Sequence, residues 1–183
     1  MKVFLDFEAS SLSNHSYPIE VAWVFEDDRR ESHLIAPAAG WTDWDDASEA
    51  IHRIDRATLA AEGAPHDRVA QRMVAELTGH DLFASAPSWD GKWLSMLLRT
   101  AGIDRRALRL RDTDDAVRDT VTDILRHHLV DGALARAVHN IVAQSDRRGG
   151  GQPAHRALAD AVAERERWCR ARDAALALAG TPS

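Results

Sequence analysis

Short apolar segments and polar turns alternate along the first part of the chain. Residues 3–7 form a brief apolar run rich in strand-forming side chains, which predicts a central strand. Residues 19–26 and 31–36 have a similar character and are separated by the turn sequence DDRR, which predicts a hairpin. Two further short strands are expected over residues 80–88 and 108–110.

The rest of the chain has mainly helical patterns. Between residues 65 and 78, for example, Val69, Met73 and Leu77 recur at the spacing of one helix face. Helices are expected over residues 43–62, 65–78, 90–101, 114–145 and 154–178, with a flexible glycine-rich loop over residues 146–153. Early strands followed by alternating helices and strands predict an α/β fold with a mixed sheet.

The length and composition favour one globular domain. The 183 residues fit a single domain over residues 1–178, followed by a flexible tail at 179–183. No apolar run approaches the ~20 residues that cross a bilayer, and the N-terminus lacks the apolar core of a signal peptide. The single cysteine, Cys169, excludes an internal disulfide. We therefore expect a cytoplasmic protein with no membrane partner.

The charge balance narrows the class of partner. The net charge of -6 argues against non-specific binding to long duplex nucleic acid, which usually depends on a strongly basic face. It leaves nucleic acid open as a substrate, because an acidic total can include an acidic pocket that binds metal ions.

The first apolar strand contains an unusual pair of acids. Asp6 and Glu8 stand two positions apart in FLDFEASSL, so in a strand they point to the same face, about 6–7 Å apart. Two like charges there raise each other's pKa unless something neutralises them, and a hard divalent cation prefers oxygen ligands. An isolated pair of this kind is more often exposed at a strand end or paired with arginine. A metal site is therefore indicated only if further acids elsewhere in the sequence can join this pair.

Two later segments supply such candidates. Asp90 follows a predicted strand and turn at the start of a helix, where the helix dipole alone also favours an acid. His155 and Asp160 follow in HRALAD, and on one continuous helix they would point about 140° apart. They can share a site if His155 precedes the helix, an arrangement that Pro153 and the glycines before it favour.

The order and spacing of these residues resemble the DEDDh family of 3′–5′ exonucleases. That family includes proofreading subunits of replicases, ribonuclease T and oligoribonuclease. The resemblance spans residues 3–162 and consists of FLDFEASSL with Asp6 and Glu8, SWDGKWLSMLL with Asp90, and HRALADAV with His155 and Asp160. It implies a ribonuclease H-like fold, with a five-stranded mixed sheet flanked by helices on both faces.

The resemblance also implies a metal-dependent 3′–5′ exonuclease. Such an enzyme hydrolyses single-stranded or terminal RNA or DNA from a free 3′ end to nucleoside 5′-monophosphates, with two divalent cations, Mg²⁺ or Mn²⁺. By resemblance, Asp6 bridges the two ions, while Glu8 and Asp160 hold the ion that activates water. Asp90 acts from the opposite side, and His155 is the general base.

Residues after the first motif are candidates for holding the substrate. By resemblance, Ser10, Ser11 and Leu12 line the pocket for the terminal nucleotide. Trp89 precedes Asp90 and offers a ring on which a base can stack, although local packing explains it equally well.

Two other interpretations stay open from the sequence alone. In the first, the chain is a catalytically silent module of the same fold that binds nucleic acid or a protein partner. In the second, it is an unrelated domain whose acids lie on the surface. The second of these predicts no effect of metal ions. Family members include homodimers, so the resemblance leaves a homodimer open for this chain.

Overall fold

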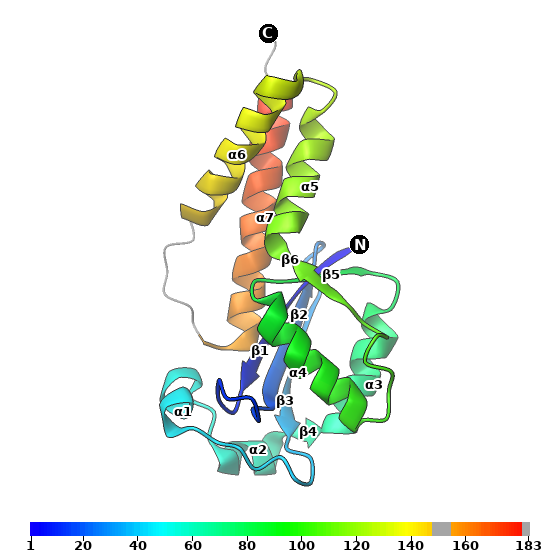
Figure 1. Ribbon diagram of the computed structural model, residues 1–183, viewed down its shortest axis with the longest axis vertical. Coiled ribbons are helices and arrows are strands. Elements are labelled where there is room, and N and C mark those ends of the chain that lie inside the picture. Colours follow the sequence, from blue (N-terminus) through cyan, green and yellow to red (C-terminus); the bar gives the residue numbers. More distant parts are fainter. Residues whose placement is uncertain (148–154, 181–183) are drawn as a thin grey trace.

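A computed structural model describes residues 1–147 and 155–180. In this part of the chain the strands form one sheet of six, in the order β4-β3-β2-β1-β5-β6 (Figure 1). The strands are β1 (Lys2–Ala9), β2 (Pro18–Phe25), β3 (Arg30–Ala36), β4 (Ala64–Pro65), β5 (Asp81–Ala84) and β6 (Leu110–Asp112).

The sheet is mixed, as the sequence predicts. Strand β1 pairs antiparallel with β2 and parallel with β5, while β2 pairs antiparallel with β3 in the expected hairpin. The expected count of five strands is wrong by one. The additional strand, β4, is only two residues long and is defined by its pairing with β3, so no hydrophobic period reveals it.

The helices also follow the predicted order, with two of them divided. They are α1 (Asp46–His52), α2 (Arg56–Glu62), α3 (His66–Leu77), α4 (Pro87–Thr100), α5 (Thr113–Leu125), α6 (Asp131–Arg147) and α7 (Ala157–Ala179). The expected helix over 43–62 breaks at Arg53, which has a left-handed backbone with φ 59°, and Asp55 then caps α2 by accepting a hydrogen bond from Thr58 N–H.

The segment expected to be helical over 114–145 contains α5 and α6, separated by residues 126–130. Of the expected glycine-rich loop, residues 146 and 147 belong to α6, and the remainder lies outside the described residues. Among the described helices, none is both long enough and apolar enough to span a bilayer.

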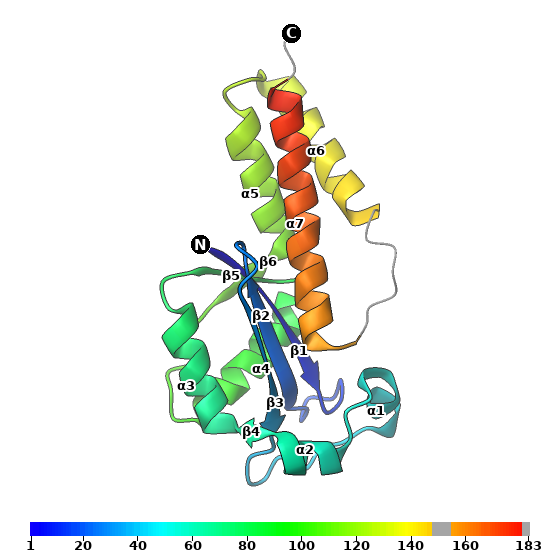
Figure 2. The same ribbon diagram turned by 180° about the vertical axis from the view of Figure 1, so that it is seen from behind.

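Helices cover both faces of the sheet. Leu5 and Phe7 of β1 point into a core shared with α3 and α4, whereas Phe4 points into a second core shared with α5, α6 and α7. Figure 1 shows α4 in front of the sheet, and the reverse view in Figure 2 shows α7 there instead. Because residues alternate along β1, Asp6 and Glu8 face α7 together with Phe4.

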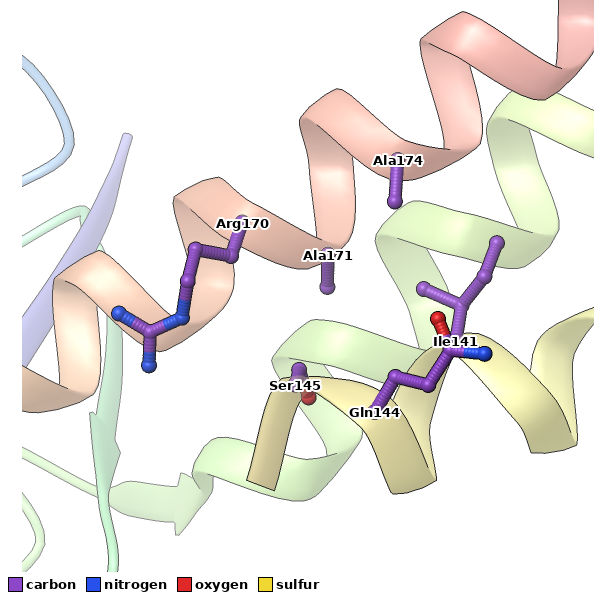
Figure 3. Close-up of a pocket in the computed structure, with 6 residues that line it drawn as sticks. All are labelled: Ile141, Gln144, Ser145, Arg170, Ala171 and Ala174. Carbon is purple, nitrogen blue, oxygen red and sulfur yellow. The ribbon is translucent and has the colours of Figure 1, made fainter. Parts of the chain in front are cut away.

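Helices α5, α6 and α7 continue beyond the sheet as a three-helix arm (Figure 1). Between α6 and α7, Ile141, Gln144 and Ser145 face Arg170 and Ala171 (Figure 3). The cavity that these side chains line measures about 20 Å³. A space of that volume holds about one water molecule.

Trp168 connects the arm to the sheet. Its ring lies 5.8 Å from that of Phe4, and its Nε1–H donates a hydrogen bond of 2.9 Å to Thr120 Oγ1 on α5. We expect Trp168→Ala to lower the free energy of unfolding by about 3–5 kcal/mol, because it removes a large buried ring. Urea denaturation followed by circular dichroism measures the change.

Leu176→Ala is the matched control for this variant, since Leu176 lies on the same helix and is 52% exposed. Its expected effect is about 0.5 kcal/mol or less. Equal losses in the two variants would contradict the assigned core.

Candidate active site

Strand β1 carries two of the predicted acids on one face. Asp6 lies opposite Ala22 of β2, and Glu8 lies opposite Glu20. The regular pairing is interrupted between Glu8 and Ala9 by a shift of register. Irregularities of this kind bend a strand and re-aim side chains, and they are frequent beside active sites. Glu8 is therefore the last regularly paired residue of β1, near the C-terminal end of the strand.

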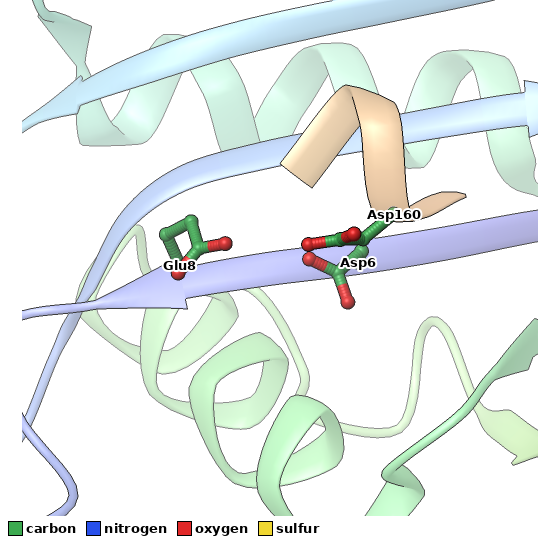
Figure 4. A group of neighbouring side chains, drawn as sticks. All are labelled: Asp6, Glu8 and Asp160. Atoms are coloured by element: carbon green, nitrogen blue, oxygen red, sulfur yellow. The ribbon is translucent and has the colours of Figure 1, made fainter. Parts of the chain in front are cut away.

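The first turn of α7 supplies the third acid. Ala157 and Ala161 are fully buried, and such small side chains let the start of the helix approach β1 and β2 closely. Asp160 points down from this turn toward Asp6 and Glu8 (Figure 4). One carboxylate oxygen from each of the three residues lies within 4.8 Å of the other two. This spacing suits a shared divalent cation with oxygen ligands.

The electrostatics of this cluster favour a bound cation. Burial, followed by the charges of Asp90, Glu8 and Asp160, raises the pKa of Asp6 from 3.8 to about 9. Burial, followed by the charges of Asp160 and Glu20, raises the pKa of Glu8 from 4.5 to about 8, although the guanidinium of Arg156 acts in the opposite direction. Ionised carboxylates are therefore costly here without a positive partner. The donor set fits Mg²⁺ or Mn²⁺, which prefer oxygen.

Asp90 lies beside the cluster without belonging to the group of three. It is the fourth residue of α4, is only 2% exposed, and accepts a 3.3 Å hydrogen bond from the backbone N–H of Ala86. Burial raises the pKa of Asp90 to about 7, against the lowering effect of hydrogen bonds from the backbone of Ala86 and Phe7. Its charge raises the pKa of Asp6, so the two are neighbours, and direct metal ligation by Asp90 stays a prediction.

His155 precedes α7, as the sequence predicts. It has a left-handed backbone with φ 51°, a conformation that histidine adopts more readily than most residues, and Arg156 follows it as the N-cap residue of the helix. His155 is thus free of the helical rotation that would turn it away from Asp160. In the described part of the chain it makes no hydrogen bond to the acids. Its role as a general base stays a prediction.

The residues predicted to hold substrate differ in exposure. Ser10 and Ser11 are buried, and both hydroxyls donate hydrogen bonds to Asp43, so they fasten the segment before α1 to the end of β1. Leu12 is 68% exposed and Trp89 is 36% exposed, so these two present apolar surface to solvent. Contact between these four residues and a nucleotide stays a prediction.

Two acids were missed by the sequence analysis. Glu164 lies one turn after Asp160 on α7, and burial raises its pKa, although Arg167 counteracts this. Its charge raises the pKa of both Asp6 and Asp90. The spacing of four residues from Asp160 was the available signal. Glu20 stands in an otherwise apolar strand, which was a signal too, and it is only 2% exposed.

Solved structures of exonuclease I are similar to this chain in fold. The chain superposes on exonuclease I from Methylocaldum szegediense with a TM-score of 0.66 and 19% identity, covering 93% of this chain and 40% of that one. For the Escherichia coli enzyme with a dT13 oligonucleotide the TM-score is 0.64 at 16% identity, covering 90% and 39%. For the zinc-bound complex of the E. coli enzyme with single-stranded DNA, the TM-score is 0.63 at 16% identity, covering 90% and 38%.

The fold is similar to that of part of exonuclease I. At this level of identity the likeness concerns the fold alone, and the chain spans about two-fifths of the length of these exonuclease I chains. The expected ribonuclease H-like architecture is confirmed, with the additional strand β4. No protein-family model and no curated protein sequence matches the chain.

The raised pKa values predict how stability depends on pH in the presence of a chelator. The unfolded chain releases the Asp6 proton near pH 3.8, whereas the folded protein keeps it until about pH 9. The stability linked to this group is complete below the lower value and is lost as the pH rises through the higher one. We therefore expect the Tm of the metal-free protein to fall between about pH 4 and pH 9.

Asp6→Asn removes this titration, so the variant should lose less stability than the wild type over the same range. Differential scanning fluorimetry of both proteins across the pH series measures the difference. Parallel pH profiles of the two proteins would contradict the buried position of Asp6.

Proposed function

We propose that this protein is a metal-dependent 3′–5′ exonuclease that acts on single-stranded nucleic acid. The observation that carries the proposal is the meeting of Asp6, Glu8 and Asp160 from two distant segments, with buried Asp90 beside them. The exonuclease I fold supports it, because complexes of the E. coli enzyme with single-stranded DNA are among the similar structures. Single-stranded DNA is therefore the first substrate to test, with RNA beside it.

The chain's own residues account for metal binding and substrate position. Asp6, Glu8 and Asp160 hold divalent cations, and Asp90 completes the set from the side of α4. When bound, two such cations neutralise charge and stabilise both the attacking and the leaving oxygen of a phosphodiester. In this proposal the last phosphodiester before the free 3′ end approaches the acids from the C-terminal end of β1. Leu12, which follows that end, is exposed.

His155 is the proposed general base. It accepts a proton from the attacking water, so that the water oxygen forms a bond to phosphorus as the bond to the 3′ oxygen of the preceding nucleotide breaks. The products are a nucleoside 5′-monophosphate and a chain shortened by one nucleotide. Histidine is the side chain that enzymes use most often for such a proton transfer.

Removal of the acids tests the metal site. We expect Asp6→Ala and Asp90→Ala each to abolish hydrolysis of a 5′-labelled single-stranded oligonucleotide in Mn²⁺, because each removes a carboxylate from the proposed metal site. The assay resolves shortened products on a denaturing gel, with matched DNA and RNA substrates. Asp123→Ala is the control, since Asp123 is exposed on the arm. Wild-type rates in either cluster variant would reject the assignment.

Metal binding by itself separates the alternatives. We expect Mn²⁺ to raise the Tm of the wild type and to leave that of Asp6→Ala nearly unchanged, since an ion that binds only the folded state stabilises it. Stabilisation without nuclease activity on either substrate would favour a catalytically silent module. No effect of Mn²⁺ on the wild type would favour a domain whose acids have no metal role.

The proposed base is tested by His155→Ala. We expect this variant to lower kcat roughly 10²–10⁴-fold, because it removes the proton acceptor while keeping the acids. The acidic limb of the pH–rate profile should disappear with it. His128→Ala provides a control at an exposed histidine in the turn between α5 and α6. An unchanged pH–rate profile in His155→Ala would assign the proton transfer to another group.

A further inference from the structure

A buried carboxylate in the sheet holds the beginning of α7. Glu20 of β2 is 2% exposed and accepts three hydrogen bonds from the segment where α7 starts. Arg156 donates through Nε at 3.1 Å and through Nη2 at 2.8 Å, one to each carboxylate oxygen. The backbone N–H of Ala157 donates the third, at 3.0 Å. A paired, charge-assisted contact of this kind fixes orientation as well as distance.

Each partner of this contact compensates the charge of the other. A buried carboxylate is costly unless it is paired and hydrogen-bonded, and here both the guanidinium and the N-terminus of a helix supply positive charge. Arg156 itself is half exposed, so the cation sits at the edge of the site while the anion lies inside the sheet. Loss of either partner leaves the other without its compensation.

The position of the contact connects it to the candidate active site. Glu20 lies directly opposite Glu8 in the pairing of β1 and β2, so both carboxylates are on the face toward α7. Arg156 follows His155 in the chain, and its carbonyl accepts a hydrogen bond of 3.1 Å from the N–H of Asp160. Arg156 thus connects the proposed base and the third acid to β2, the strand that pairs with the strand of Glu8.

We propose that Glu20 and Arg156 form a latch that positions Asp160 and His155 against the acids of β1. Neither residue touches the reacting atoms, so both are positioning residues, and the inference rests on the proposed exonuclease function. The latch holds the first turn of α7 at the depth where its carboxylate meets Asp6 and Glu8. A small displacement of such groups is enough to lower a rate roughly 10²-fold.

Arg165 provides a matched control on the same helix. It ties α7 to the turn between β2 and β3, donating hydrogen bonds of 3.0 Å to the carbonyl of Phe25 and 2.8 Å to that of Glu26. It therefore anchors the same helix to the same hairpin, five residues beyond Asp160. A contact that only docks α7 should behave like Arg165, whereas the latch should act on the site.

The experiment compares Arg156→Ala, Glu20→Gln, Arg156→Lys and Arg165→Ala in the 183-residue chain. The measurements are kcat and KM on single-stranded DNA at saturating Mn²⁺, and amide hydrogen exchange along α7. We expect Arg156→Ala and Glu20→Gln to lower kcat roughly 10- to 100-fold with little change in KM, and to speed exchange at residues 157–161. Arg156→Lys keeps the charge and should recover part of the rate. Arg165→Ala should keep kcat while exchange rises farther along α7.

The outcomes separate the latch from the proposed function. Unchanged kcat in folded Arg156→Ala and Glu20→Gln, or unchanged exchange at 157–161, would overturn the latch. An inactive wild type would reject the exonuclease proposal and with it the effect on kcat. Localised exchange in the Arg156 and Glu20 variants would then still support the latch as the device that holds the first turn of α7.

Discussion

The partial burial and mutual repulsion of a group of carboxylates are the constraint around which this molecule is organised. Asp6, Glu8 and Asp160 converge on one side of the sheet, and burial together with their like charges raises the pKa of Asp6 and of Glu8 far above the ordinary range. A fold does not bring such groups together for stability, because without a cation the arrangement opposes folding at neutral pH. Strongly shifted pKa values of this kind are concentrated at functional sites. The rest of the structure holds the acids in place against that repulsion.

The packing around the acids supplies the opposing energy. Leu5 and Phe7 anchor β1 to the α3 and α4 side, and Phe4 anchors it to Trp168 of α7. Alternation along one strand thus commits three side chains to the two cores and leaves the intervening acids at the seam with α7. Glu20 contributes in a different way, because its ion pair with Arg156 fastens the opposite element to the same sheet. Hydrophobic burial holds β1, and the ion pair between buried Glu20 and half-exposed Arg156 holds the start of α7.

The sequence predicted those features of the site that depend on neighbouring residues alone, namely the alternation of side chains along a strand and the starts of helices. The period of two placed Asp6 and Glu8 on one face, and the helix signals placed Asp90 in the first turn of α4 and His155 before α7. The left-handed Arg53 that divides α1 from α2 has no such signal, because arginine has no preference for that backbone. The partner of Glu20 is 136 residues away, and only the docking of α7 reveals it.

The length of α7 has a mechanical consequence. It runs as one helix of 23 residues, about 34 Å at 1.5 Å per residue, from Ala157, in the turn that carries Asp160, to the far end of the arm. An uninterrupted helix transmits tilt like a stiff rod, and Trp168 lies near its middle, at the sheet. A tilt imposed at the C-terminal end of α7 is therefore expected to displace its first turn, which carries Asp160. The far end of the arm and the third acid of the site therefore belong to one continuous helix.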